Sequence, residues 1–232
     1  MRYLIMFLFF CAVPASVVFV WNIQPPYLSP AEAGVRVEKP VGDGQHYSQG
    51  SGVFLANGLV LTAAHVVKFA PENPKVTVII DGWRIEGALV LDGQSENLDL
   101  ALIKIPIKAL SPARRNRKPV SVCLQNPGPS QKVVVAALGK VSDAVTVPTP
   151  ITSDGQTGNW TNLLSTGYHQ GSSGGGVFNI AQNCLWGILN LELSGPSLTD
   201  GHIIDLSAFV PASRITPFLN KYYGQKRGAP KE

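Results

Sequence analysis

The chain has 232 residues, of which 45% are hydrophobic and 15% charged, with 23 glycines and 18 prolines. This composition excludes a disordered or collagen-like chain and suits one large β domain or two small ones. The net charge of +4 comes mostly from dispersed basic residues. We interpret the one basic cluster, at 114–118, as a solvated loop, so nucleic acid is not an expected partner.

The N-terminal segment is strongly apolar. Residues 3–21 carry no charge and follow a single Arg2. A helix needs about 20 apolar residues to span a bilayer, and this segment is close to that length. The length favours an uncleaved membrane anchor. The alternative is a signal peptide that uses residues 4–13 and is cleaved before Ser16. Both interpretations export the rest of the chain. It is either anchored on the extracytoplasmic side of a membrane or, after cleavage, secreted or periplasmic.

Two cysteines, Cys123 and Cys184, lie in the exported part. Their apolar surroundings fit two buried free thiols as well as they fit one disulfide. The sequence contains no Cys-x-x-Cys motif and no Cys/His cluster. A structural metal site is therefore not expected.

The rest of the chain reads as a series of short strands. Residues 23–38 contain Pro and Ala without periodicity, and we interpret them as a linker. The β-rich runs that follow are bounded by Gly, Pro, Asn and Asp, with no long amphipathic helix between them. This predicts an all-β fold, an antiparallel barrel or sandwich, and a helix only from residue 211. The expected strands are 50–56, 59–67, 75–80, 83–92, 99–105, 119–124, 132–139, 144–152, 159–166, 175–180, 184–193 and 202–210.

Three separated stretches each carry a residue whose chemistry depends on the other two. His65 lies in "LTAAHVV", Asp99 begins a strand in "NLDLALIKI", and Ser173 lies in "GSSGGG". A serine hydroxyl becomes a good nucleophile when an imidazole removes its proton and a carboxylate orients that imidazole. The glycines allow the backbone to present N–H groups to a developing oxyanion.

These stretches resemble the motifs of the trypsin-like serine proteases. The likeness rests on "TAAH", on "DLALIKI", and on Gly-Ser-Ser-Gly-Gly at 171–175, where that family has Gly-Asp-Ser-Gly-Gly. The compact spacing and the later "SAFVPASRI" are similar to the bacterial HtrA (DegP-like) branch. The resemblance covers about residues 40–222. It implies two antiparallel six-stranded β-barrels with a C-terminal helix, preceded by the N-terminal hydrophobic segment.

The resemblance also implies the roles of the site residues. Ser173 would be the nucleophile, His65 the general base and then acid, and Asp99 the orienting carboxylate. The backbone N–H groups of Gly171 and Ser173 would form the oxyanion hole. Ser172 is the alternative nucleophile, but the motif assigns the second serine. No cofactor is implied, and the substrate is a polypeptide.

Specificity follows from the same layout. The floor of the S1 pocket falls at Gly167, and its wall falls at Asn190, Leu191 and Glu192, on a strand that would bind substrate by β-addition. Because Gly167 carries no charge and Glu192 is expected to face solvent, we expect an apolar P1 residue. A basic P1 residue is the alternative if Glu192 turns into the pocket. His169 is expected to be an ordinary loop residue.

The chain departs from the family pattern in two places. Ser172 replaces the Asp that captures a new N-terminal amine in activatable members, so we expect no zymogen activation of that type. Only a basic tail follows the helix, where HtrA proteases usually carry a PDZ domain. The expected organisation is 1–22 anchor or signal peptide, 23–38 linker, 39–222 protease domain and 223–232 tail.

These features predict a serine endopeptidase that acts outside the cytoplasm. The alternative is a catalytically silent barrel that serves as a binding module. An α/β-hydrolase is excluded, because in that fold the nucleophile precedes the acid and the histidine in the chain.

Overall fold

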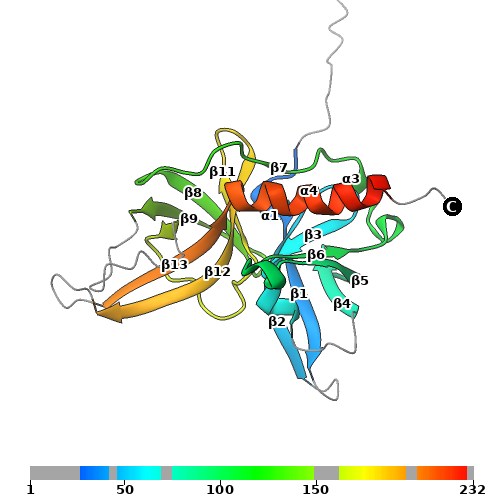
Figure 1. Cartoon of the computed structure of the whole chain (residues 1–232), viewed down its shortest axis with the longest axis horizontal. Helices are drawn as coiled ribbons and strands as arrows, with labels where there is room; N and C mark the ends of the chain where they lie inside the picture. The colour runs from blue at the N-terminus through cyan, green and yellow to red at the C-terminus, as the bar shows by residue number, and fades with distance from the viewer. Residues whose placement is uncertain (1–26, 42–45, 69–74, 149–161, 197–202, 229–232) are drawn as a thin grey trace, which may run out of the picture.

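A computed structural model of the chain describes residues 27–41, 46–68, 75–148, 162–196 and 203–228 (Figure 1). Six of its strands form a closed barrel in the N-terminal half, and all neighbours in that barrel are antiparallel. In barrel order these strands are β1 (Gly34–Val41), β2 (His46–Phe54), β3 (Leu59–Thr62), β6 (Ala101–Lys104), β5 (Trp83–Asp92) and β4 (Lys75–Ile80).

The C-terminal half forms a second antiparallel barrel, which closes through the pairing of β11 with β12. A short seventh strand, β7 (Ser121–Val122), runs parallel to β12 outside this ring. The predicted pair of six-stranded barrels is therefore confirmed. In order the second ring contains β8 (Lys132–Ala137), β9 (Lys140–Val147), β10 (Leu163–Leu164), β13 (Ile203–Pro211), β12 (Cys184–Pro196) and β11 (Gly176–Asn179).

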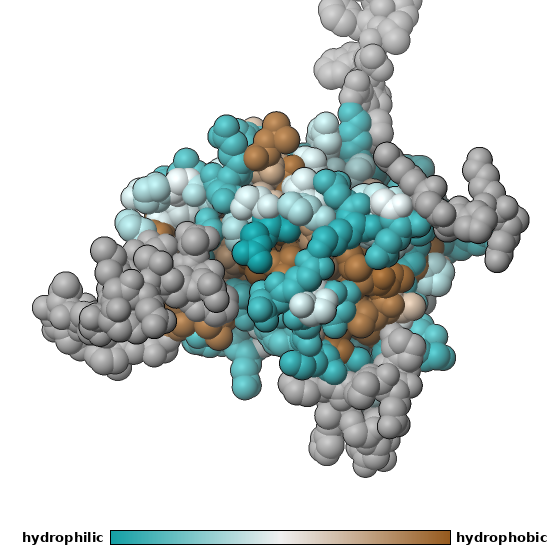
Figure 2. Space-filling model, viewed as in Figure 1, coloured by the Kyte–Doolittle hydropathy of each residue, from teal (hydrophilic) through white to brown (hydrophobic). Residues whose placement is uncertain are grey.

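The C-terminal helix α4 (Ala212–Gly228) begins where β13 ends in the second barrel and extends over the first barrel (Figure 1). It buries one face, as its periodicity predicts, and its other face is exposed. Figure 2 shows this side of the molecule to be mostly hydrophilic, with hydrophobic side chains gathered over β4 to β6. The helix continues into the expected tail, and its buried residues are Ala212, Ile215, Phe218, Leu219 and Tyr222.

Short helical turns interrupt the strands at several connections. The expected strand 59–67 ends at Thr62, and its second half is the helix α2 (Ala64–Val67). The prediction failed there because Ala64, Val66 and Val67 are all buried, so the apolar run continues through the turn without a change of composition. The other turns are η1 (Gln94–Glu96), η2 (Ile107–Ala109) and α3 (Pro112–Arg115).

The linker predicted at 23–38 overlaps the folded domain. From residue 27 onward this segment belongs to the folded domain, with Leu28 buried, a turn of helix α1 (Pro30–Ala33) and then β1. A capping box between Ser29 and Glu32 begins α1. β1 pairs with β2 on one side and β4 on the other, so it closes the first barrel. β1 contains Arg, Glu, Lys and Pro, so it has no apolar run that would predict a strand.

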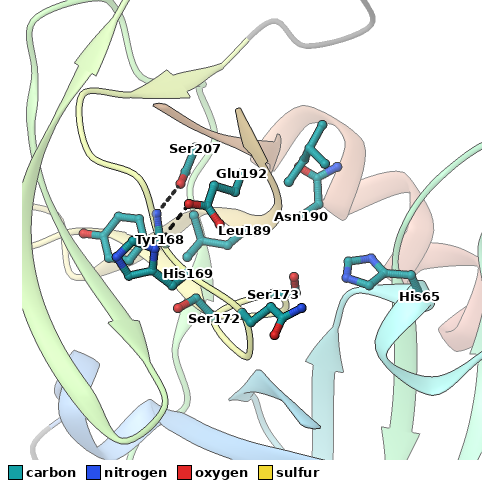
Figure 3. Close-up of a pocket in the computed structure, with 11 residues that line it drawn as sticks. His65, Tyr168, His169, Ser172, Ser173, Leu189, Asn190, Glu192 and Ser207 are labelled. Carbon is teal, nitrogen blue, oxygen red and sulfur yellow. Dashed lines mark hydrogen bonds and ion pairs between the residues drawn. The ribbon is translucent and has the colours of Figure 1, made fainter. Parts of the chain in front are cut away.

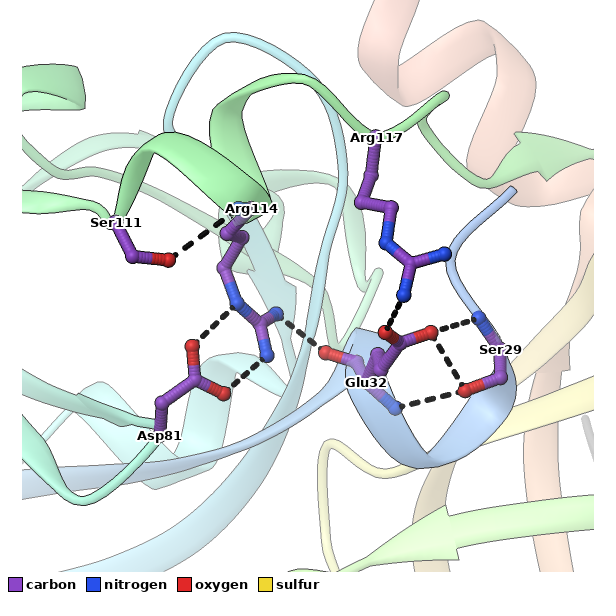
Figure 4. A network of polar contacts seen from close by, with 6 residues as sticks. All are labelled: Ser29, Glu32, Asp81, Ser111, Arg114 and Arg117. Atoms are coloured by element: carbon purple, nitrogen blue, oxygen red, sulfur yellow. Dashed lines mark hydrogen bonds and ion pairs between the residues drawn. The ribbon is translucent and has the colours of Figure 1, made fainter. Parts of the chain in front are cut away.

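The basic cluster at 114–118 is not simply a solvated loop. Arg114 is only 8% exposed, and its guanidinium donates two hydrogen bonds to the carboxylate of Asp81 on the β4–β5 turn (Figure 4). The same guanidinium reaches the backbone carbonyl of Glu32, and Arg117 forms an ion pair with the Glu32 carboxylate at 2.6 Å. These contacts tie α1, α3 and the β4–β5 turn together.

The sequence left two further questions open. Cys123 and Cys184 form a disulfide, which joins the segment after β7 to the start of β12. The apolar segment 3–21 lies outside the described residues. Within the described ranges, no helix combines the length and the apolarity needed to cross a bilayer.

Candidate active site

The three residues that the sequence singled out come from both barrels. His65 and Ser173 line one pocket (Figure 3), and Asp99 contacts His65. His65 lies on α2 of the first barrel, and Asp99 lies between η1 and β6. Ser173 lies on the loop before β11 in the second barrel. The pocket has a volume of about 210 Å³, and both His65 and Ser173 line it.

Asp99 holds His65 through both the ring and the backbone. The ring Nδ1 lies 2.7 Å from Asp99 Oδ2, and the backbone N–H of His65 donates to Oδ1 at 2.9 Å. An ionised carboxylate only accepts hydrogen bonds, so Nδ1 carries the proton and Nε2 is left as a base. The backbone bond also satisfies an N–H group at the start of α2, where Ala63 offers no side-chain cap.

Ser173 lies on a tightly turned loop that faces His65. Within this loop Ser172 N donates to the carbonyl of His169, and Gly175 N donates to the carbonyl of Ser172. Figure 3 shows Ser173 and His65 on facing walls of the pocket. Among the described residues, no hydrogen bond joins Ser173 Oγ to the imidazole.

Two glycines of this loop have positive φ values, +89° at Gly171 and +87° at Gly174. Both angles lie in the region that glycine adopts without the steric cost of a Cβ atom. At Gly174 a Cβ atom would also lie 2.0 Å from the carbonyl oxygen of Ser51. The glycine run thus lets the second barrel's loop approach the backbone of the first barrel.

The sequence predicts that Glu192 faces solvent, but its side chain is only 35% exposed. It lines the pocket, and its carboxylate Oε1 lies 3.2 Å from Nδ1 of His169, which lines the same pocket (Figure 3). The same oxygen is 3.6 Å from the position of a Cβ atom built on Gly167. Gly167 itself does not line the pocket, but it lies beside it, against Asp205. The predicted floor is therefore flanked by carboxylates.

Asn190 and Leu191 also line the pocket. Asn190 is 6% exposed, and among the described residues its Oδ1 has no hydrogen-bond partner. Beyond Leu189 only β13 pairs with β12 among the strands described, which leaves the other edge of β12 open beside the pocket. An open edge can pair with an extended peptide.

Ser207 and Tyr168 were not predicted as site residues, yet both line the pocket. Ser207 lies opposite Glu192 in the β12–β13 register, and its hydroxyl accepts a hydrogen bond from Tyr168 N. Burial raises the pKa of the Tyr168 hydroxyl, and its hydrogen bond with Ser142 opposes this rise. Only the strand register brings Ser207 to the site, so no local motif could have identified it.

The pocket contains a candidate nucleophile, the Ser173 hydroxyl, a candidate base, the His65 imidazole, and the side-chain amide of Asn190. No group of three or more His, Cys, Asp or Glu side chains suited to a metal ion occurs among the residues described. The arrangement of a hydroxyl facing an imidazole held by a carboxylate suits acyl transfer.

The family model described as a trypsin-like peptidase domain matches residues 50–188. No curated protein has significant similarity to the chain.

Solved structures share the fold at low identity. The active form of the Rv3671c protease from M. tuberculosis has a TM-score of 0.57 at 19% identity, over 87% of this chain and 83% of that one. A structure described as HL collagenase has a TM-score of 0.59 at 17% identity, over 90% and 99%. A human pathogenic astrovirus serine protease has a TM-score of 0.50 at 19% identity, over 82% and 96%.

Proposed function

Because the chain belongs to the trypsin-like peptidase family and is therefore a serine endopeptidase, we propose that it cleaves polypeptides through a triad of His65, Asp99 and Ser173. The observation that carries this proposal is the paired contact of Asp99 with the ring and backbone of His65, in a pocket that Ser173 also lines. Ser173 and His65 come from different barrels, so the site requires the folded pair.

In the proposed reaction Ser173 Oγ attacks the scissile carbonyl while His65 Nε2 takes its proton. Asp99 keeps the proton on Nδ1 and stabilises the imidazolium that forms. His65 then protonates the leaving amine, and an acyl-enzyme on Ser173 remains. Water, deprotonated by His65, hydrolyses this ester and restores the site. The missing hydrogen bond between Ser173 and His65 fits a free enzyme, since such contacts often tighten only when substrate binds.

The backbone N–H groups of Gly171 and Ser173 are proposed to bind the oxyanion. The substrate backbone would add to the open edge of β12 at 190–192, where the unpartnered Oδ1 of Asn190 offers a buried acceptor to a substrate N–H. These groups favour an extended polypeptide over a small ester. The likeness to the HtrA branch remains a prediction.

The test is active-site labelling with a fluorophosphonate probe, followed by mapping of the modified residue. We expect the label on Ser173, and we expect Ser173→Ala and His65→Ala to remove both labelling and peptide cleavage while thermal unfolding stays cooperative. A label on Ser172 would contradict the assignment of the nucleophile. No labelling of the folded protein would favour the silent barrel.

We also propose that the domain acts outside the cytoplasm, held at a membrane by residues 3–21. The uncharged apolar run supports an anchor, and the Cys123–Cys184 disulfide fits an oxidising compartment. The full-length protein should stay with membranes during carbonate extraction. A soluble mature form that begins near Ser16 would instead mean a cleaved signal peptide.

A further inference from the structure

Ser51 lies on β2 of the first barrel, at the point where the two barrels meet around the active-site loop. It is fully buried, and its backbone N–H donates to the carbonyl of Ser173 at 2.7 Å. Its side chain has no part in the proposed chemistry. Ser51 nevertheless hydrogen-bonds to both residues proposed to form the oxyanion hole, Gly171 and Ser173.

The Ser51 hydroxyl makes two further hydrogen bonds to the second barrel. Its Oγ donates to the carbonyl of Gly171 at 2.9 Å and accepts from the backbone N–H of Leu138 at 2.8 Å. A hydroxyl has one proton to donate, and the Leu138 N–H occupies an acceptor site. The proton must therefore point at Gly171, so the orientation of the hydroxyl is fixed.

Gly171 needs such an external constraint. With a φ of +89° and no side chain, it has wider backbone freedom than any other residue type. Holding the Gly171 carbonyl fixes the plane of the Gly171–Ser172 peptide group, and so limits the backbone rotation at Gly171 that would turn its own N–H away from the oxyanion.

We propose that Ser51 is a positioning residue that holds the oxyanion hole from the opposite barrel. It anchors the carbonyls of Gly171 and Ser173, the two residues whose N–H groups would bind the oxyanion. This role rests on the proposed function. It gives the first barrel a catalytic task beyond supplying His65 and Asp99.

The test compares Ser51→Ala with Thr62→Val. Thr62 is fully buried and donates to the backbone carbonyl of Ser51 at 2.6 Å, so its replacement removes a neighbouring buried hydrogen bond without touching the Ser51 hydroxyl. Loss of an oxyanion donor lowers kcat about 100- to 1000-fold, and we expect mispositioning in Ser51→Ala to cost about 10- to 100-fold. KM should change less than about threefold. Ser51→Thr, which keeps the hydroxyl, should recover most of the loss.

A transition-state mimic separates positioning from general destabilisation. A peptide trifluoromethyl ketone, whose adduct carries an oxyanion, should bind Ser51→Ala more weakly by the same factor as kcat/KM falls. The matching peptide carboxylic acid, which forms no adduct, should bind both proteins equally. Equal losses of kcat in Ser51→Ala and Thr62→Val, or an unchanged ketone affinity, would overturn the proposal. An unreactive wild-type protein would instead overturn the proposed function.

Discussion

Asp99 accepts two hydrogen bonds from His65, one from ring Nδ1 at 2.7 Å and one from the backbone N–H at 2.9 Å. The carboxylate thereby fixes the ring and the first turn of α2 at once. Each of its oxygens faces a donor, so the site demands two acceptors. An amide, which has one acceptor and one donor, cannot satisfy it.

We therefore predict that Asp99→Asn folds but is nearly inactive. The backbone N–H always donates, so the amide oxygen turns toward it and the amide NH₂ faces Nδ1. This arrangement favours the tautomer with the proton on Nε2, which cannot accept a proton from Ser173. The expected fall in kcat is about 10⁴-fold, as for the equivalent change in other Ser-His-Asp enzymes. Steady-state kinetics with Asp92→Asn as the control will check it, and an activity within tenfold of wild type would contradict the role of Asp99.

Two glycines of the serine loop should respond differently to alanine. In Gly174→Ala the new Cβ would meet the Ser51 carbonyl oxygen and Thr62 Oγ1 at 2.0 and 2.3 Å, so the barrels must separate. We expect a loss of several kcal/mol in the free energy of unfolding. In Gly171→Ala the nearest atom is the end of the Leu138 side chain, at 2.9 Å, which can move. This variant should fold with about 1–2 kcal/mol of strain and lose activity. Denaturant unfolding and turnover, measured together, distinguish the two, and equal stability would contradict the packing argument.

The fold could be predicted from the sequence because most strands are apolar or alternating runs bounded by turn residues. Alternating or continuous apolar runs bounded by turn residues placed most strands of both barrels, and one-sided periodicity placed α4. Local motifs predicted His65, Asp99 and Ser173, because a serine nucleophile needs an imidazole base and a carboxylate that orients it. The structure places His65 beside Asp99 and opposite Ser173.

Features that depend on long-range pairing could not be predicted. β1 reads "GVRVEKPV", and only its partners β2 and β4 make it a strand. Arg114 is buried because Asp81 and Glu32, 33 and 82 residues away, meet it. The direction of the Glu192 side chain follows from the register of β12 with β13. None of these relations leaves a local pattern in the sequence.

The N-terminal boundary of the domain can be tested by truncation. A chain that begins at residue 39, the predicted boundary, lacks α1 and most of β1, which opens the first barrel and leaves edges of β2 and β4 unpaired. We expect it to be insoluble or to unfold without a cooperative transition. A chain that begins at residue 27 should unfold cooperatively, because it keeps Leu28 and the Glu32 contacts. Cooperative unfolding of both chains would show that β1 is dispensable.

Glu32 should make stability depend on acid pH. The backbone N–H of Ser29, then its hydroxyl, Arg117 and Arg114, hold the pKa of Glu32 below its usual 4.5, while burial opposes them. The folded state thus binds the proton less readily than the unfolded state. Its stabilisation is present above about pH 4.5 and is lost as pH falls through the lower folded pKa. Glu32→Gln should lower Tm at pH 7, and the difference from wild type should shrink in more acid solution. Glu86→Gln, in an exposed pair, should change Tm little, and a pH-independent difference for Glu32→Gln would contradict the linkage.

The position of Glu192 changes the expectation for the P1 residue. The apolar preference assumed an uncharged pocket, but Glu192 lines it, Asp205 lies against Gly167, and no Lys or Arg is among the lining residues described. A P1 Lys or Arg could lay its methylene stem along Leu191 and bring its charge to the Glu192 carboxylate. His169 competes for that carboxylate, because its Nδ1 already lies 3.2 Å from Oε1. We therefore expect basic P1 residues to be preferred over apolar ones of similar size.

Matched peptides that differ only at P1, with Arg, Lys or Leu, test this preference. Glu192→Gln keeps the shape of the side chain and removes its charge, so the ratio of kcat/KM for Arg over Leu should fall about tenfold, within the range expected for a partly solvated hydrogen bond to a charged group. Removing the competitor in His169→Ala should keep or increase the ratio. Because Ser173 and His65 are untouched, cleavage of the Leu peptide should change little in Glu192→Gln. A wild-type preference for Leu that Glu192→Gln leaves unaltered would show that Glu192 does not select the substrate, and the original apolar expectation would stand.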